Sequence, residues 1–403
     1  MLTLNTLQQQ KKQRWFYVSI GVILLLFLGL IYAWSIFRIP LEQEFGWSKA
    51  QTSLTFSISM VMFCLGGLVS GIITERKGAR WTLSFCALCL AAGFFGASRI
   101  STLTGIYLTY GVCCGFGVGL GYNASISTIV KWFPDKQGLI SGIALMGFGL
   151  GGMILGTAGA GLIQQLGWRT TFIVFAAAFA GIILLGALLL RPAPSSFIHA
   201  LAQEDNRHLK PYEDIDWLAM VRRKNFWLYF VYAFILTAGG LAVINISAVY
   251  AQDVLQSGLT QAAAAAGIIS AANGLGRVLS GQLFDMKGYR VTMITICLVF
   301  AAAAAALFLS EQHIHPVILF LAFGLIGLGY GGVPPINSAF TSQFFGSRHY
   351  PMNYSIMNLC ILPASIVGPM CTNSSYNQTF LIIFLFALLS LGIVLLIHRP
   401  KNS

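Results

Sequence analysis

The sequence predicts an all-α membrane protein of twelve transmembrane helices, arranged as two six-helix repeats. Charged residues make up 9% of the 403 positions and hydrophobic residues 57%, whereas soluble proteins carry about 25% charged residues. The apolar runs are unbroken and about 20 residues long, which is the length of a helix that crosses a bilayer. The strands of a membrane barrel would instead alternate in polarity. Two motifs from the first half also recur in the second half.

The twelve apolar runs are read as helices because only helices and closed barrels satisfy their backbone hydrogen bonds in lipid. The first run is too long for a signal peptide and has no Ala-x-Ala cleavage site after it, so we expect it to be retained. The predicted spans are residues 15–37, 49–74, 81–97, 104–130, 139–163, 168–190, 225–250, 260–284, 291–309, 316–341, 353–371 and 378–397.

The net charge of +12 is explained by topology. With the N-terminus in the cytoplasm, 19 of the 24 Lys and Arg residues fall in inner loops and ends, and only Arg38, Lys49, Arg99 and Arg169 fall outside. This positive-inside bias predicts that both termini are cytoplasmic. We therefore expect a multi-pass protein of a bacterial inner (plasma) membrane, with the lipid bilayer rather than nucleic acid as its surroundings.

One long polar stretch, residues 191–224, separates six spans from six. Its prolines and its cluster of acidic side chains are typical of a cytoplasmic linker. The predicted organisation is an N-terminal six-helix bundle over residues 1–190, the linker over 191–224, and a C-terminal six-helix bundle over 225–403.

The two bundles repeat one another. The segment Gly71-x-x-x-Glu75-Arg76-x-Gly78-x-Arg80, after span two, recurs 210 positions later as Gly281-x-x-x-Asp285-x-Lys287-Gly288-x-Arg290. The segment Gly119-Leu120-Gly121-Tyr122, in span four, recurs 208 positions later as Gly327-Leu328-Gly329-Tyr330. Two unrelated motifs at nearly the same offset indicate duplication of a six-helix unit.

With these loops, the six-plus-six spans and the long central linker, the chain resembles the major facilitator superfamily, whose binding sites lie near the membrane midplane between repeated halves. Three further segments resemble the oxalate/formate antiporter family, and the related monocarboxylate transporters share the arginine of span eight. These segments are Tyr32-Ala33-Trp34-Ser35, Trp132-Phe133-Pro134-Asp135-Lys136-Gln137-Gly138-Leu139, and Asn273-Gly274-x-x-Arg277. The resemblance implies the major facilitator fold and transport of a small organic anion.

Arg277 is the strongest candidate for a substrate contact. This choice rests on the position of the residue within an apolar span and does not need the family resemblance. Placing Arg inside the hydrocarbon costs roughly 3 kcal/mol on insertion scales, so the side chain is expected to face a wet cavity or an anion. Ser270, Asn273, Arg277 and Ser280 recur at helical spacing and share one face. A guanidinium can clamp a carboxylate through two parallel hydrogen bonds. The alternative is a structural arginine that bonds helix-end carbonyls or snorkels to the inner surface.

The resemblance adds further substrate-binding candidates. Tyr122 and Tyr330 match tyrosines that line the central cavity in the family and donate hydrogen bonds to a carboxylate. Tyr32 and Trp34 match its aromatic pair in span one, although an interfacial aromatic belt would also explain them. Asn273 and Asn358 are polar residues within spans, and they could bond substrate or a neighbouring helix.

Span eleven departs from the oxalate transporters. They place a lysine eight residues after its Asn-Tyr pair, whereas Asn353-Tyr354 is followed at that place by Ile361. One cation in the cavity favours a monoanion over a dianion, since an unpaired second carboxylate in a dry cavity is costly. We therefore expect a monocarboxylate of the formate, lactate or pyruvate type.

The repeated loops are expected to form the inner gate of the transporter, as the resemblance implies. Their charged side chains would influence the balance between outward- and inward-open states. The alternative is that these charges are simply solvated. The predicted gating residues are Gly71, Glu75, Arg76, Gly78, Arg80, Asp285 and Arg290.

Several activities are not expected. The sequence has no phosphate-binding loop, catalytic grouping or metal cluster of plausible spacing, so we expect no enzyme, no cofactor and no metal. No acidic residue or histidine lies mid-span, which leaves anion exchange, facilitated diffusion and entry with a proton on the substrate open. We expect a monomer. The alternatives are a drug efflux pump, which the acid-free spans disfavour, and a transport-dead sensor, which usually carries an added cytoplasmic domain.

Overall fold

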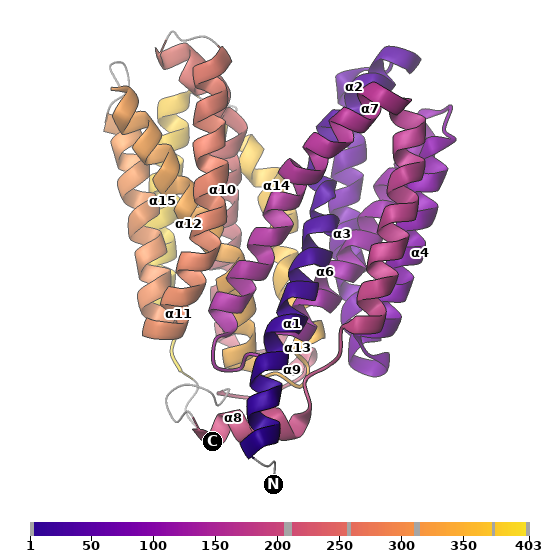
Figure 1. Cartoon of the computed structure of the whole chain (residues 1–403). Coiled ribbons are helices and arrows are strands. Elements are labelled where there is room, and N and C mark those ends of the chain that lie inside the picture. Colours follow the sequence, from indigo (N-terminus) through magenta and orange to yellow (C-terminus); the bar gives the residue numbers. More distant parts are fainter. Residues whose placement is uncertain (1–3, 205–211, 256–258, 310–314, 373–374, 400–403) are drawn as a thin grey trace. The chain divides into compact units, whose positions relative to one another are not determined.

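The computed structural model describes residues 4–204, 212–255, 259–309, 315–372 and 375–399, and every regular element in these ranges is helical. The chain divides into two compact units, each of which is described separately (Figure 1). This confirms the predicted all-helical fold class.

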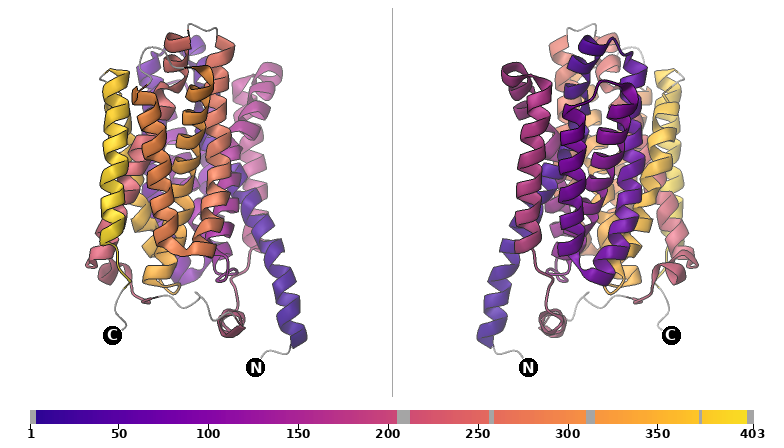
Figure 2. Two further views of the ribbon diagram at one scale, coloured as in Figure 1. Left: turned by 90° about the vertical axis from the view of Figure 1, so that its left-hand side faces the viewer. Right: turned by 90° about the vertical axis from the view of Figure 1, so that its right-hand side faces the viewer.

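Unit 1 falls within Met1–Asp135, Ala144–Lys210 and His349–Ile356. Figure 2 shows the N-terminal part of α1 projecting past the other helices of this unit, and α8 lying across its direction. The elements of unit 1 are α1 (Leu4–Leu28), η1 (Gly29–Ala33), α2 (Trp34–Phe45), α3 (Lys49–Lys77), α4 (Ala79–Ser98), α5 (Leu103–Ile106), the π-helical η2 (Tyr107–Cys114), α6 (Gly115–Val130), most of α7 (Gln137–Leu189), α8 (Ser195–Glu204) and nearly all of α13 (Tyr350–Met357).

Unit 2 falls within Lys136–Ile143, Pro211–Arg348 and Met357–Ser403. Its elements are the first residues of α7, then α9 (Trp217–Val221), α10 (Lys224–Leu255), α11 (Leu259–Leu309), α12 (Pro316–Phe345), the 3₁₀ segment η3 (Asn358–Cys360), α14 (Ile361–Met370) and α15 (Tyr376–Leu396).

The two units exchange corresponding pieces of chain. Residues 136–143, which begin span five, pack in unit 2, and residues 349–356, which begin span eleven, pack in unit 1. The predicted bundles, drawn strictly in chain order, do not include this exchange. Because span eleven is the repeat of span five, the exchange follows the internal duplication.

Nine described helices are long and apolar enough to cross a bilayer. Two of them join a pair of predicted spans through a sharp kink, α7 at Gly167 and α11 at Gly288. The predicted eleventh span, 353–371, is divided among α13, η3 and α14. The structure is therefore consistent with twelve spans, because the helix count is lowered only by two kinked pairs and one broken helix.

Gly78 and Gly288 explain why glycine occurs in both repeated loops. Their φ angles are 86° and 80° with extended ψ angles of 164° and 174°, a region that only glycine adopts without strain. Each glycine therefore allows a tight reversal from one span into the next.

The Gly-Leu-Gly-Tyr repeat builds close helix contacts. A Cβ added at Gly119 would overlap the carbonyl of Phe63 on α3, and one at Gly327 would approach the carbonyl of Ile269 on α11 closely. Small residues permit such approach between membrane helices, which associate through packing rather than through the hydrophobic effect. In each unit the motif thereby fixes the position of the tyrosine that follows it.

Candidate functional site

Arg277 lies on α11 and is 9% exposed. Its Nε donates a hydrogen bond of 3.0 Å to Oδ1 of Asn273, one helical turn earlier. Side chains on a helix tilt toward its N-terminus, so the guanidinium lies on the side of Asn273, away from the charged end of the span at Asp285 and Lys287. This direction argues against snorkelling to the predicted inner surface.

The backbone around Arg277 is packed closely on two sides. A Cβ added at Gly142 of α7 would overlap the carbonyl oxygen of Arg277. Gly276 is equally close to the carbonyl of Leu328 on α12, and Gly331 to the carbonyl of Asn273. The segment that carries the guanidinium is therefore held by two neighbouring helices.

Tyr330 and Asn358 also lie in unit 2. Tyr330 is partly exposed. Its ring lies against Gly240 of α10, so closely that a Cβ added at Gly240 would overlap the ring. Its chain neighbour Gly331 packs on Asn273, so Tyr330 lies at the level of the Asn273–Arg277 pair. Asn358 occupies η3 and accepts a hydrogen bond of 2.6 Å from Nδ2 of Asn337. The structure therefore places four of the seven predicted substrate residues in one unit.

Tyr122 is buried in unit 1 and belongs to an aromatic group. Its hydroxyl lies 3.0 Å from the hydroxyl of Tyr354. Its ring makes edge contacts with Phe63, at a centroid distance of 5.1 Å, and with Phe148, at 4.9 Å. This burial excludes a position in an interfacial aromatic belt.

Tyr32 and Trp34 are adjacent in sequence but separate in structure. Tyr32 lies in the 3₁₀ segment η1, is 49% exposed, and packs edge-on against Phe148 at 5.2 Å. Trp34 is 3% exposed, packs against Tyr110 with tilted rings at a centroid distance of 4.4 Å, and donates its indole N–H to the carbonyl of Thr52 at 2.9 Å. Phe148 thus joins Tyr32 to Tyr122, whereas Trp34 lies in a different aromatic cluster.

Sequence reasoning missed most of the partners of these residues. Phe148 and Phe63 carried no signal for this site, because each acts through packing against a candidate from another helix. Asn337, by contrast, is a polar residue within a predicted span, and the sequence offers it for bonding to substrate or to another helix. Tyr354 belongs to the Asn-Tyr pair that sets the register of span eleven, and its place next to a polar residue at the start of an apolar span could have identified it.

In unit 2, the repeated loop holds the exchanged start of α7. The Asp285 carboxylate accepts hydrogen bonds from the backbone N–H groups of Gly138 at 2.8 Å and Leu139 at 2.7 Å. These are unsatisfied N–H groups of a helix N-terminus, where a carboxylate is favoured by the helix dipole. Gly281, on the same loop motif, allows the close backbone approach to Gly138.

In unit 1, the corresponding residues hold the exchanged start of span eleven. Glu75 contacts Nδ1 of His349, and a Cβ added at Gly71 would approach the backbone of Met352 closely. Gly71 and Glu75 thus contact the exchanged segment as Gly281 and Asp285 do. Arg76, Arg80 and Arg290 are exposed.

Substituting Asp285 by asparagine is expected to loosen the exchanged segment of α7. Hydrogen bonds to a charged group are worth about 1.5–3 kcal/mol each. Weakening two of them should therefore raise, about tenfold or more, the fraction of molecules in which the start of α7 has separated from Asp285. The measurement is maleimide labelling of Ser141→Cys, a buried position, with and without Asp285→Asn. Asp216→Asn is the matched control, since Asp216 caps α9 through the N–H of Ala219 outside this segment. Equal labelling rates in the Asp285 and Asp216 variants would contradict a latching role.

No group of His, Cys, Asp or Glu in the described part of the chain could hold a metal ion. The candidate residues supply one guanidinium, several hydroxyl and amide groups, and aromatic walls. This chemistry suits binding of an organic anion.

Comparison with known proteins agrees with the resemblance. An uncharacterized MFS-type transporter of Escherichia coli K12, YhjX, is 29% identical to this chain over 350 residues. The alignment covers 87% of this chain and 85% of the relative. The oxalate:formate antiporter of Oxalobacter formigenes is 25% identical over 382 residues, covering 92% and 88% of the two chains. Monocarboxylate transporter 3 of Rattus norvegicus is 25% identical over 362 residues, covering 88% and 73%.

The fold is shared with the proton:xylose symporter XylE, a solved structure of the same superfamily, with a TM-score of 0.69 at 16% identity over 96% of this chain and 95% of that one. The sequence profile of the Major Facilitator Superfamily matches residues 18–369, which covers the first eleven predicted spans apart from a few terminal residues. The chain belongs to the Major Facilitator Superfamily of membrane transporters.

Proposed function

We propose that this transporter carries small organic monocarboxylates by alternating access. The observation that carries the proposal is Arg277, a buried cation within a membrane span whose side chain is held by Asn273 toward the middle of that span. Relatives named for oxalate, formate and monocarboxylates support the substrate class.

The proposed binding roles follow from chemistry. Arg277 clamps the carboxylate, and Asn273 orients the guanidinium. Tyr330, at the same level of unit 2, and Tyr122 donate hydrogen bonds. Tyr32, on the 3₁₀ segment, and Asn358, within the broken span eleven, contribute where helix geometry is interrupted, a feature that often marks functional positions.

Trp34 is given a supporting role. Its indole N–H is engaged by the carbonyl of Thr52 and its ring by Tyr110. We propose that it fixes the start of α2, directly after the segment η1 that carries Tyr32, rather than bonding substrate.

The preference for a monoanion rests on the charge of the spans. Ile361, in α14, stands where the oxalate transporters have a lysine. A dianion bound to Arg277 alone would keep one carboxylate in a low-dielectric cavity without a cation, which costs several kcal/mol.

For gating, we propose that the contacts of Asp285 with α7 and of Glu75 with His349 form and break during transport. They hold the two exchanged segments through the same repeated loop. Both contacts lie at the predicted inner side, so their formation would close that side.

The experiment is counterflow in proteoliposomes. Vesicles are loaded with formate, acetate, lactate, pyruvate, oxalate or malonate, and uptake of the same carboxylate in labelled form is measured with and without a pH gradient. We expect exchange of monocarboxylates, and any stimulation by a gradient would report a co-transported proton. Exchange confined to dicarboxylates would overturn the monoanion assignment, and no exchange of any carboxylate would overturn the substrate class.

A further inference from the structure

The predicted outer ends of the two repeats carry matching acid–aromatic pairs. In unit 1, Nε1 of Trp168 donates to Oε2 of Glu44 at 2.6 Å. In unit 2, the hydroxyl of Tyr376 donates to Oδ2 of Asp253 at 2.6 Å. The acids stand 209 positions apart and the aromatics 208 apart, which is the offset of the repeated motifs. Each pair joins the first helix of a repeat to its sixth, so the two places are structural counterparts.

In unit 1, this place is filled by a cation from the chain itself. Arg169 follows Trp168 and donates to Glu44 at 2.9 Å and to the carbonyls of Ser98 and Ile100 at 3.2 Å each. Its guanidinium carbon lies 4.3 Å from the centroid of the Trp168 ring. One arginine side chain thus connects an acid, an aromatic face and the end of span three.

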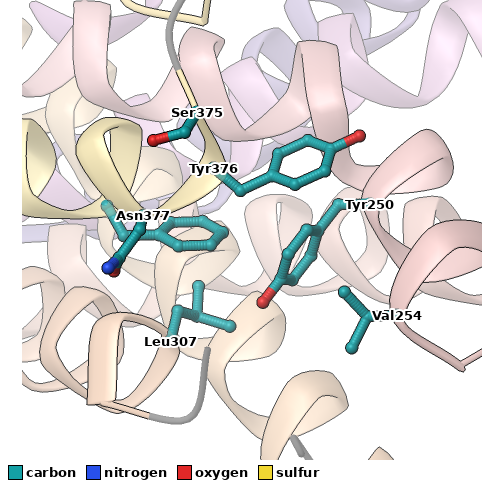
Figure 3. A pocket seen from close by; sticks show the side chains of 7 residues that line it. Tyr250, Val254, Leu307, Ser375, Tyr376 and Asn377 are labelled. Carbon is teal, nitrogen blue, oxygen red and sulfur yellow. The ribbon is translucent and has the colours of Figure 1, made fainter. Parts of the chain in front are cut away.

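In unit 2, the counterpart of Arg169 is Asn377, 208 positions later, and the counterpart of Phe45 is the smaller Val254. A cavity of about 220 Å³ lies here (Figure 3). A water molecule takes about 30 Å³ of liquid, so the space admits several waters or one small organic molecule. The cavity is lined by Tyr250, Val254, Leu307, Ser375, Tyr376, Asn377 and Phe380.

The walls of this cavity favour a cation that bears hydrogen-bond donors. The rings of Tyr376 and Phe380 pack against Tyr250 at centroid distances of 4.8 and 5.0 Å, and aromatic faces attract cations. Oδ1 of Asn377 is buried and has no hydrogen-bond partner among the described residues. A buried acceptor without a donor is unfavourable, and an N–H donor would satisfy it. The Asp253 carboxylate, which accepts a hydrogen bond from the hydroxyl of the lining residue Tyr376, adds negative charge nearby.

We propose that this cavity is a binding site for a small organic cation with N–H donors, of the guanidinium or primary ammonium class. The ligand takes the place that the Arg169 side chain fills in the other unit. It bridges the end of α10 to the start of α15 as Arg169 bridges its own helices. This site is independent of the carboxylate site and does not rest on the proposed function.

The test is equilibrium dialysis of the purified full-length protein with labelled methylguanidinium at low millimolar concentration. We expect one site in the wild type and none in Asn377→Arg, whose own side chain occupies the cavity. We expect a second site in Arg169→Asn, which opens the counterpart place in unit 1. Asn377→Leu, which removes the acceptor at similar volume, should weaken binding at least tenfold and serves if the arginine variant does not fold.

Two competitors distinguish charge from hydrogen bonding. Methylurea has the donors without the charge, and tetramethylammonium has the charge without donors, so neither should displace methylguanidinium at equal concentration. The proposal is overturned if the wild type binds no methylguanidinium, if Asn377→Arg binds as the wild type does, or if either competitor displaces it equally.

Discussion

Replacing Arg277 by alanine is expected to abolish carboxylate transport while leaving the protein in the membrane. The guanidinium is the one cation placed well inside a predicted span, and hydrogen bonds to charged partners contribute about 1.5–3 kcal/mol each. Losing two of them should lower carboxylate counterflow about a hundredfold or more. Arg277→Lys keeps the charge without the planar fork and should retain a small fraction of the rate.

The readout is labelled carboxylate counterflow, normalised to the amount of inserted protein. Arg99→Ala is the matched control, because Arg99 is an exposed cation just past the end of α4. It should transport at the wild-type rate. Wild-type counterflow by the Arg277→Ala protein would show that the guanidinium does not bind substrate.

Asn273→Asp is expected to make the rate of carboxylate transport depend on low pH. The amide oxygen lies 3.0 Å from Nε of Arg277, so a carboxylate there would pair with the guanidinium and compete with substrate. Two unit charges 4 Å apart interact by about 4 kcal/mol at an effective dielectric of 20. Counterflow at neutral pH should therefore fall by two orders of magnitude or more. Lowering the pH protonates the new carboxylate and should restore part of the rate.

Asn273→Ala separates charge from positioning. It removes the hydrogen bond to Nε but adds no competing charge, so the KM should rise several-fold while the pH profile keeps its wild-type shape. Counterflow is measured from pH 5 to 8 for both variants. If the aspartate variant follows the wild-type pH profile at a wild-type rate, position 273 does not control the charge of the site.

The sequence predicted the helical fold well because its signals were strong and local. Span length, charge bias and the two repeats at offsets of 210 and 208 positions required no knowledge of packing. The interruptions of helices were not predicted. The 3₁₀ segments at Gly29–Ala33 and Asn358–Cys360 and the π-helical Tyr107–Cys114 lie within apolar runs that the sequence predicts as single continuous spans. Such local geometry depends on packing against other helices.

Site prediction had the same limit. Motifs singled out Arg277, Asn273 and the two tyrosines as candidates, but the residues that pack against the tyrosines come from other helices. The counterpart pairs Glu44–Trp168 and Asp253–Tyr376 were not predicted either. The residue types differ between the two repeats, Glu against Asp and Trp against Tyr, so a search for identical repeated motifs does not find them. Their shared chemistry became visible only when hydrogen bonds could be compared between the repeats.

The exchange of eight-residue segments has a consequence for biosynthesis. A half-molecule ending in the linker would contain Gly138 and Leu139 but not the carboxylate that accepts their N–H groups. The complementary half would contain His349 without Glu75. Neither fragment could complete its own hydrogen bonding, so newly made halves should remain incompletely folded until they meet, and co-expressed fragments should protect each other from degradation.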